Sequence, residues 1–438
     1  MYQLALADQL DDEDALHHPS PASSPLSSPL SSLPSSRAAS PIPSTSAGDG
    51  LSANASSMHQ DDPPIADKKR RNKLRSKASR KRKRAQQPKG EPRPNVRAKY
   101  VHSAVPEPAP YNVEAAPVEA SAYKAARAPA ISTREYTLED LVGPSSAFGF
   151  REVKWDGRTT TPICDDRGRI VVVLAGQPND LTWADVHQDA VKALNRAHAD
   201  VNWASEQQNP RGAFDSLFCG ISYGGGQTHP KNLRHSDETL RTLEALNRDP
   251  AVTRIAHFAA DVCRTWAPRL YAHYDDYLTR LLAWDPGLSR NFSRSVWACI
   301  AYNFGPRTVT RRHRDRGNIP YGWCPVTALG DFDPTRGGHM VLWDLKLVIQ
   351  FPPGSTILIP SAIVEHSNTA IAPHEKRYSI TQYTPGGLFR WVDQGFQTQN
   401  TQRDSMTPEE QALDAQRRSK RWAEGLSYFS TVLELKTL

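Results

Sequence analysis

Apolar positions with a regular period begin near Tyr136 and continue to about Phe396, which marks out one folded domain. Early in this stretch "RIVVVLAG" (169–176) is continuously apolar, as expected of a buried strand. The next stretch, 182–201, places its apolar residues at helical spacing instead. Two more helices are expected over 236–249, where a Ser is a good N-cap, and over 252–282. The first half of the domain is therefore predicted to be largely helical.

From Ser295 onward the apolar runs become short, β-branched and aromatic-rich, with Gly and Pro between them. These runs are "SVWACIAYNF", "PVTALG", "HMVLWDLKLVIQF", "STILIP" and "RYSITQYT". Such spacing predicts an antiparallel barrel or jelly roll carried on a helical layer. Beyond it, Thr407-Pro408-Glu409-Glu410 is a capping box that should begin a helix ending near Trp422. Residues 401–438 are therefore expected to form a C-terminal helical extension.

The chain before the domain has a different composition. Residues 19–45 ("PSPASSPLSSPLSSLPSSRAASPIPST") are dominated by Ser and Pro. Such a segment buries too little apolar surface to offset its conformational entropy. Residues 85–130 stay rich in Pro and Ala and are expected to be a linker. We therefore predict a disordered tail over residues 1–130 and a folded domain over 131–400.

Charge is distributed unevenly over the chain, whose formal net charge is +7. Residues 1–66 contain eight acidic residues and one Arg, whereas residues 67–84 ("DKKRRNKLRSKASRKRKR") contain twelve Lys or Arg and one Asp. The basic run fits a bipartite signal for a nuclear-import receptor, so we expect a nuclear protein. The same run would also suit non-specific binding to nucleic-acid phosphates, or a solvated charged tail without a receptor.

Membrane and disulfide chemistry are not indicated. The chain does not open with a basic segment followed by an apolar one, and no run approaches the ~18 apolar residues of a membrane span. Its five cysteines are far apart and form no Cys-x-x-Cys pair. We expect a monomer with reduced thiols and no membrane partner.

Six His-x-Asp triplets occur in the chain, so the spacing alone says little about metal binding. Five of them lie in the tail or on or beside expected helices: His59, His187, His198, His235 and His273. Two residues that are two apart on a helix point in different directions, which argues against shared ligation. The sixth triplet, His313-Arg314-Asp315, lies in the β-rich half directly after an expected strand. It is the candidate metal-binding pair.

A third ligand is available in "VEHSNTAI", where His366 lies 51 residues after Asp315 and follows another expected strand. Two His and one carboxylate on one face of an Fe(II) ion leave the remaining positions open, as in non-haem iron oxygenases. Zinc accepts similar ligands, so the triad by itself does not select the metal.

The strand "RYSITQY" begins eleven residues beyond His366. Because alternate residues of a strand share a face, Arg377, Ser379, Thr381 and Tyr383 should line one side. A guanidinium that points into a barrel is costly unless an anion meets it. A dicarboxylate cosubstrate would supply that anion, held as a bidentate pair beside a hydroxyl. The alternative is a structural ion pair with an Asp or Glu.

These motifs resemble a known superfamily. His-x-Asp, a His about fifty residues later and His-x10-Arg-x-Ser resemble the 2-oxoglutarate/Fe(II) dioxygenases. "HRDRGN", "GGHMVLWDL", "GSTILIPSAIVEHSN" and "RYSITQYTPGGLFRW" resemble the TET/JBP family of nucleobase oxygenases, in the version that accompanies transposons in mushroom-type fungi. Over roughly residues 140–400 the resemblance implies an α+β fold with a double-stranded β-helix (jelly-roll) core and supporting helices. It also implies that His313, Asp315 and His366 bind Fe(II) as the catalytic residues.

The resemblance implies further contacts to cosubstrate and substrate. Arg377 and Ser379 match the residues that hold 2-oxoglutarate, and His339, after a Gly pair, matches a further contact to it. Asn318, three residues after Asp315, matches a residue that reads the flipped base, and its amide offers both the donor and the acceptor that such reading needs. Tyr383 matches an aromatic residue that stacks on the base.

Arginines flank the predicted triad: Arg307, Arg311, Arg312 and Arg314. They are candidates for holding DNA phosphates, with a solvated face as the alternative. The Gly-rich stretch "SYGGGQTHP" (222–230) would permit close approach of the backbone to DNA, or form a plain turn. In animal members of the family a second base-contacting His occupies the position that is Pro385 here.

The function implied is oxidation of the methyl group of 5-methylcytosine in double-stranded DNA, with Fe(II), 2-oxoglutarate and O2. A base within a duplex cannot reach a buried metal, so the base must flip out. The alternatives are an N6-methyladenine DNA demethylase, a protein or RNA hydroxylase on the same scaffold, and a catalytically inactive DNA-binding module.

Overall fold

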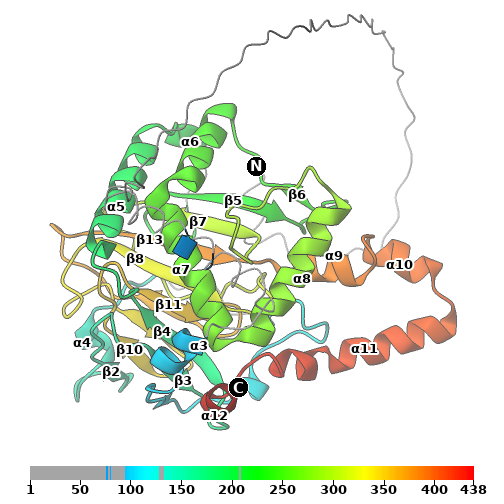
Figure 1. Cartoon of the computed structure of the whole chain (residues 1–438), viewed down its shortest axis with the longest axis horizontal. Helices are drawn as coiled ribbons and strands as arrows, with labels where there is room; N and C mark the ends of the chain where they lie inside the picture. The colour runs from blue at the N-terminus through cyan, green and yellow to red at the C-terminus, as the bar shows by residue number, and fades with distance from the viewer. Residues whose placement is uncertain (1–74, 77–78, 80–93, 128–132, 207–208) are drawn as a thin grey trace, which may run out of the picture. The chain divides into compact units, whose positions relative to one another are not determined.

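Two β-sheets and a layer of helices form the folded part of the chain (Figure 1). This computed structural model describes residues 75–76, 79, 94–127, 133–206 and 209–438. The Ser/Pro-rich stretch and nearly all of the basic run lie outside these residues. The large sheet has nine strands in the order β1-β3-β4-β11-β8-β13-β7-β5-β6, and the small sheet has four in the order β12-β9-β10-β2. Neighbouring strands are antiparallel except for the parallel pairs β1–β3 and β2–β10.

The strand bounds are as follows: β1 Glu107–Pro108, β2 Arg151–Val153, β3 Thr161–Cys164, β4 Ile170–Gly176, β5 Ser216–Ser222, β6 Lys231–Asn232, β7 Cys299–Asn303, β8 Cys324–Asp331, β9 Met340–Leu342, β10 Leu347–Ile349, β11 Thr356–Ile359, β12 His366–Asn368 and β13 Lys376–Tyr383. From β8 onward the chain passes back and forth between the sheets, with β9 and β10 as a hairpin in the small one. Strands β8, β11 and β13 belong to the large sheet, and β9, β10 and β12 belong to the small one. This alternation between two antiparallel layers is what a jelly roll requires. The predicted α+β class is confirmed.

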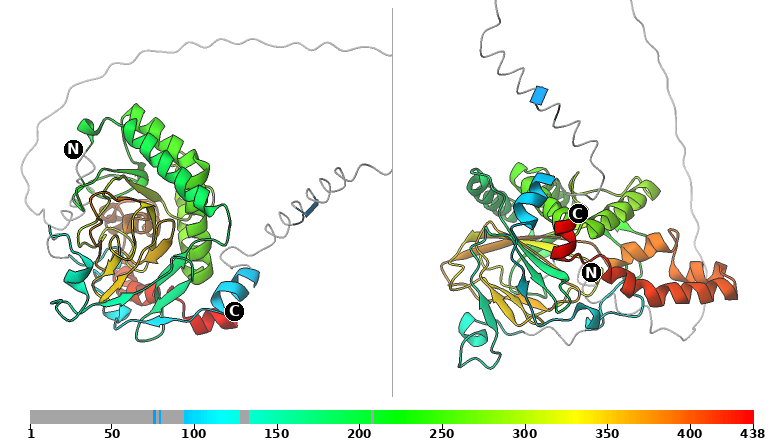
Figure 2. Two further views of the ribbon diagram at one scale, coloured as in Figure 1. Left: turned by 90° about the vertical axis from the view of Figure 1, so that its left-hand side faces the viewer. Right: turned by 60° about the horizontal axis from the view of Figure 1, so that its bottom comes forward.

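The helices and helical turns are α3 Pro94–Val96, η2 Arg97–Val101, η3 Val113–Ala115, α4 Leu138–Leu141, α5 Trp183–Ala199, η4 Trp203–Ser205, α6 Asp237–Arg248, α7 Pro250–Trp266, α8 Pro268–Trp284, α9 Gly386–Asp393, α10 Gln399–Ser405, α11 Pro408–Leu426 and α12 Val432–Thr437. Helices α5 and α7 lie along one side of the large sheet (Figure 2). There they pack on Tyr302, Tyr378 and Ile380, which point outward from β7 and β13. One face of β13 is therefore occupied by the helical layer.

The helices predicted over 182–201 and 236–249 are confirmed, but the single helix predicted over 252–282 is wrong. The chain forms α7 and α8, which are separated at Ala267 (φ −140°, ψ 64°). The cause is Pro268, which has no backbone N–H to donate and whose ring would clash with the preceding turn of a continuous helix. At the first position of α8 the same residue is favourable.

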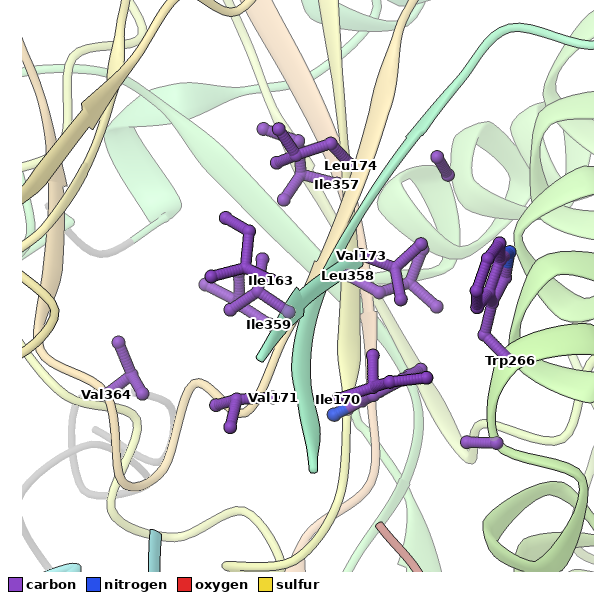
Figure 3. Close-up of a cluster of buried hydrophobic side chains, with 14 of the residues drawn as sticks. Ile163, Ile170, Val171, Val173, Leu174, Trp266, Ile357, Leu358, Ile359 and Val364 are labelled. Carbon is purple, nitrogen blue, oxygen red and sulfur yellow. The ribbon is translucent and has the colours of Figure 1, made fainter. Parts of the chain in front are cut away.

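The centre of the large sheet is filled by aliphatic side chains from β4 and β11. All seven residues of β4 are buried, which confirms the strand predicted over 169–176. Val173 pairs with Leu358, and both lie on the side of Trp266 of α7 (Figure 3). This packing fixes the position of β11, after which the chain continues to His366.

Residues before the predicted domain belong to the same core. Val101 and Val113 are fully buried and Tyr123 is 5 % exposed, so the linker predicted over 85–130 is wrong for residues 94–127. At the other end of the chain, Leu435 of α12 joins the same cluster. The capping box that begins α11 is present as predicted, although the helix continues to Leu426. In the described part of the chain, no helix is both long and apolar enough to span a membrane.

Candidate metal centre

The fold brings His313, Asp315 and His366 together as the sequence predicted. One ligand atom from each residue lies within 4.8 Å of the others, the one such group of potential ligands among the described residues. His366 begins β12, and its backbone forms a bridge with His313: the N–H of each donates to the carbonyl of the other, at 3.0 and 2.9 Å. This short ladder places the two imidazoles side by side, with ring centroids 4.3 Å apart.

In both histidines the ring nitrogen that faces the carboxylate of Asp315 carries no proton. Nδ1 of His313 lies 2.6 Å from the carbonyl of Arg311, and Nδ1 of His366 lies 3.0 Å from the carbonyl of Val364. A carbonyl only accepts, so Nδ1 carries the proton in each ring and the lone pair is on Nε2. These Nε2 atoms lie 3.7 and 3.9 Å from the oxygens of Asp315. Burial lowers the pKa of both imidazoles, which keeps them neutral and able to bind a metal.

Arg211 is a part of the site that the sequence analysis missed. Its Nη2 lies 2.8 Å from Oδ1 of Asp315. Burial alone would raise the pKa of the Asp315 carboxyl, but Arg211, the two histidines and a hydrogen bond from Ser361 together outweigh that effect, and the pKa is lowered. The loop that carries Arg211 is held where its carbonyl accepts from the backbone N–H of Arg311, at 2.7 Å. No motif marks Arg211, because it lies on a loop before β5 and far from the triad in sequence.

The donor set fits a divalent transition metal. Two neutral imidazoles and one carboxylate that stays ionised are ligands suited to Fe(II) and also to Zn(II). The orientation of each ring by a backbone carbonyl is the usual support for metal-bound histidines. His313, Asp315 and His366 are therefore the residues that would hold the metal.

Arg377 lies in β13 with its guanidinium fully enclosed. The residue is 1 % exposed, and Nη1 donates to the carbonyl of Thr308 at 2.6 Å. Its Nε and Nη2 have no hydrogen-bond partner, and no carboxylate pairs with it among the described residues. Phe332 and Phe351 lie 5.7 and 5.8 Å from it. Burial lowers the pKa of Arg377 to about 10, so the group remains a cation at neutral pH and lacks an anion.

The structural alternative of an Asp or Glu partner for Arg377 is therefore not realised in the described part of the chain. Its neighbour on the same face, Ser379, accepts a hydrogen bond from Nδ2 of Asn303 at 2.9 Å. Because that bond uses a lone pair of the hydroxyl oxygen, the O–H of Ser379 remains available to donate. An anion beside Arg377 would thus find a charged donor and a neutral one.

The face of the large sheet that carries Arg377 is partly open to solvent. Phe218, Ala301, Thr381 and Val326 lie opposite one another across β5, β7, β13 and β8. Although these strands are internal, Phe218, Thr381 and Val326 are partly exposed. Tyr383, further along the same face, is also partly exposed. Solvent therefore reaches part of the inner face of the sheet, at positions further along the strands from Arg377.

His339 is placed beside this inner face. A Cβ added to Gly338 would lie 3.3 Å from Cδ of Arg377, so the chain passes against the arginine directly before His339. Nδ1 of His339 bonds the hydroxyl of Thr369 at 2.8 Å, while Nε2 is buried without a partner. Burial lowers the pKa of His339 to about 4. Its predicted contact with a cosubstrate stays a prediction that this unpartnered nitrogen supports.

Asn318 lies in the turn after Asp315, and its backbone N–H donates to the carbonyl of Asp315 at 3.0 Å. Its side chain is 8 % exposed and Nδ2 donates to the hydroxyl of Ser361 at 3.2 Å. The amide nitrogen is therefore engaged inside the protein. Base reading by Asn318 stays a prediction, and its amide oxygen is the atom left for it.

Tyr383 ends β13 on the same face as Arg377, with Cys299 directly opposite on β7. Burial raises the pKa of its phenol well above the ordinary value, with Cys299 and Asp315 adding to the effect. The ring is thus close enough to the triad to respond to its charge. Stacking of a base on Tyr383 stays a prediction.

Three of the four flanking arginines have carboxylate partners in the structure. Arg307 lies 3.6 Å from Glu135, Arg312 lies 2.5 Å from Glu365, and Arg314 lies 2.7 Å from Asp344. Arg312 also stacks on a ring, that of Trp343, at 4.2 Å. These ion pairs give the arginines a structural role, and phosphate binding by Arg307, Arg312 and Arg314 stays a prediction.

In the other described His-x-Asp triplets, the histidines have partners elsewhere in the structure. Each histidine binds elsewhere: His187 accepts from the N–H of Gly330, His198 pairs with Asp215, His235 bonds the carbonyl of Phe218 and His273 bonds the hydroxyl of Tyr321. In none of these cases is the Asp two residues later the partner.

Comparison with known proteins gives weak structural likenesses. No family model matches the chain, and no curated protein matches it. One similar solved structure is NgTET1 in complex with 5mC DNA, at 14% identity and a TM-score of 0.38, covering 55% of this chain and 84% of that chain. Another is an oxidoreductase of the 2OG-Fe(II) oxygenase family from Burkholderia pseudomallei, at 17% identity and a TM-score of 0.27, covering 44% and 78%. Neither likeness is close enough to carry an argument about function.

Proposed function

We propose that the protein is a 2-oxoglutarate- and Fe(II)-dependent dioxygenase with a double-stranded β-helix core, which oxidises the methyl group of 5-methylcytosine in DNA. The observation that carries the proposal is the buried guanidinium of Arg377. It has no anionic partner among the described residues and shares a strand face with Ser379, in a fold that also assembles a His–Asp–His ligand set.

The residues have distinct roles in this proposal. Arg377 pairs with the carboxylate of 2-oxoglutarate that lies furthest from the metal, because a desolvated charge pair needs a bidentate donor. Ser379 donates its free O–H to the same carboxylate. Arg211 keeps Asp315 ionised, so that the carboxylate competes with a proton only at low pH. Bound Fe(II) would supply O2 chemistry, in which 2-oxoglutarate becomes succinate and CO2 while the methyl group gains one oxygen atom.

The substrate is proposed from the resemblance together with the placement of the base-contacting candidates. Tyr383 offers a ring at the partly exposed end of the inner face, where a flipped base would enter. Asn318 lies three residues beyond the metal ligand Asp315 and retains its amide oxygen for an exocyclic amine. The basic run of residues 67–84 would bind DNA phosphates and direct the protein to the nucleus.

The test is mass spectrometry of nucleosides released from methylated duplexes after incubation with the protein, Fe(II) and 2-oxoglutarate. Parallel duplexes carry 5-methylcytosine or N6-methyladenine, and His313→Ala is the control that removes one ligand. We expect 5-hydroxymethylcytosine from the parent, none without 2-oxoglutarate and none from the control. Oxidation of N6-methyladenine alone would move the substrate to adenine. No succinate under any condition would contradict the dioxygenase itself.

A further inference from the structure

A small hairpin lies outside the two sheets, against the loop that carries the metal ligand Asp315. It comprises residues 117–126, closed by the antiparallel bridge between Val118 and Ala125. We call it the N-terminal hairpin, because it precedes every element of the predicted domain. Ala122 and Ala125 are fully buried, so the hairpin is packed into the structure.

Arg316, the residue directly after Asp315, fastens the loop to this hairpin. Its carbonyl accepts from the N–H of Ala125 at 3.1 Å, and its Nε donates to the carbonyl of Ala126 at 3.2 Å. Its Nη2 lies 3.5 Å from Oε1 of Glu119. One residue of the loop thus contacts both arms of the hairpin.

The hairpin is itself held from the opposite side. The hydroxyl of Tyr123 donates to Asp393 of α9 at 2.6 Å. Arg421 of α11 donates to the carbonyl of Ser121 at 2.7 Å and lies 4.1 Å from the ring of Tyr123. A Cβ added to Gly386 would lie 1.7 Å from the carbonyl oxygen of Tyr123, so no other residue fits at this contact. These contacts make the hairpin a fixed support.

The loop is anchored on its inner side as well. The N–H of Asp315 donates to the carbonyl of Ser361 at 2.9 Å, and the carbonyl of Gly317 accepts from the N–H of Gly386 at 2.8 Å. Asn318 forms a backbone bridge with Pro385. The loop from Asp315 to Asn318 therefore lies between the sheets and the N-terminal hairpin.

We infer that the N-terminal hairpin is a positioning element of the metal centre, acting through Glu119 and Arg316 on Asp315 and Asn318. The inference rests on the proposed function, since it assigns those two residues their roles. A metal carboxylate must be held to within about 0.5 Å, which a loop supported on one side only does not achieve. Groups that orient a ligand from behind set metal affinity along with the ligands themselves.

The experiment compares Arg316→Ala, Arg316→Lys and Glu119→Gln with the parent in the full chain. Co(II) affinity is measured by absorption titration, and hydrogen exchange is followed in peptides that cover residues 311–318. We expect Arg316→Ala to weaken Co(II) binding on the order of tenfold and to speed exchange in this loop, with Tm close to that of the parent. Arg316→Lys should recover part of the affinity, because it keeps the charge facing Glu119 but lacks the planar Nε–H.

Arg290→Ala is the matched control. Its side chain is 23 % exposed against 22 % for Arg316, and like Arg316 it donates to a backbone carbonyl, at 3.0 Å, and lies near a carboxylate, at 3.7 Å. If Arg316→Ala binds Co(II) as tightly as Arg290→Ala, the hairpin is scaffold only and the inference is overturned. A parent that binds no Co(II) would overturn the metal centre, and with it both the proposed function and this inference.

Discussion

At the scale of single residues, the candidate site is defined by two kinds of charged side chain. One is a buried guanidinium that has no anionic partner among the described residues, and the other is a carboxylate that stays ionised. The grouping of the candidate metal ligands and the strand face of Arg377 were predictable, because ligand spacing and strand alternation are local properties of a sequence. Arg211 was not predictable, because only the folded loop brings its guanidinium to Asp315. The engagement of the Asn318 amide with Ser361 likewise depends on packing that no local pattern records.

Arg377→Met tests whether the buried guanidinium exists for an anion. An unpaired buried cation destabilises the fold, and Met is of similar length without the charge. We expect the ligand-free variant to be as stable as the parent or more stable by about 1 kcal/mol, despite the lost bond to Thr308. Thermal denaturation measures this directly.

The same variant should lose its response to 2-oxoglutarate. A ligand at 100 times its Kd stabilises a protein by about 2.7 kcal/mol, so 2-oxoglutarate added to the Mn(II)-loaded proteins should raise the Tm of the parent further and should leave the Tm of Mn(II)-loaded Arg377→Met unchanged. Arg377→Lys should respond partly, because it keeps the charge without the fork. An equal response in parent and Met variant would place the anion elsewhere.

Tyr383 tests the base-binding end of the inner face separately from the metal. Stacking on an aromatic side chain is worth roughly 1–3 kcal/mol. Tyr383→Phe should therefore keep most base oxidation, while Tyr383→Ala should lose about ten- to a hundredfold. Both should bind Co(II) like the parent and still release succinate slowly without DNA. The measurement is the ratio of succinate to oxidised base, and parent-like coupling in the Ala variant would remove Tyr383 from the substrate site.

At the scale of elements, the sequence predicted well where one pattern dominates a segment. The apolar run of β4 and the alternation of β13 each determine an element and its faces. Prediction from the sequence failed where the buried residues are scattered and follow no period. Residues 94–127 are rich in Pro and Ala, and their buried side chains follow no period, so only the docked structure reveals them as core. The break between α7 and α8 was missed because the apolar period continues across Pro268.

Two truncations separate the tail from the support of the metal centre. Removal of residues 1–93 should leave Tm and oxidation of short duplexes nearly unchanged, while binding to long DNA weakens and becomes less steep in salt, since the twelve basic residues of the run 67–84 are lost with it. Removal of residues 1–127 also deletes Val101, Val113 and the N-terminal hairpin.

The longer deletion should lower Tm by many degrees, because each buried aliphatic side chain contributes roughly 1.5–3 kcal/mol. Circular dichroism and Co(II) titration follow the two effects. A shorter truncation that lost activity on a short duplex would show that the tail takes part in the chemistry. If the protein that lacks residues 1–93 still accumulated in the nucleus, the basic run would be excluded as the import signal.

At the scale of the whole molecule, the fold keeps several histidines neutral by burying them away from the metal ligands. In each of these histidines burial lowers the imidazole pKa below the ordinary 6.5: His187, His235, His257, His273 and His339. They are spread over the helical layer and both sheets, so their protonation couples to unfolding of the entire structure. His273 illustrates the cause, since its ring is stacked against Phe389 and Tyr428, 5.2 and 4.4 Å from their centroids.

Stability should therefore fall as the pH drops from about 6.5 towards 4. In that window the unfolded chain binds protons that the folded chain does not, because the folded pKa of His273 is about 4, and stability decreases wherever the unfolded state binds more protons as pH falls. Between pH 7.5 and 5 this one residue should contribute about 1–2 kcal/mol of the loss.

Urea titrations of the parent and His273→Phe at both pH values measure this contribution. The variant loses the bond to Tyr321 at every pH, so the comparison rests on the slope with pH: His273→Phe should lose less stability than the parent on acidification, and the exposed control His102→Asn should lose as much. Equal slopes for all three proteins would mean that His273 is protonated in the folded state and that its burial does not oppose the charge.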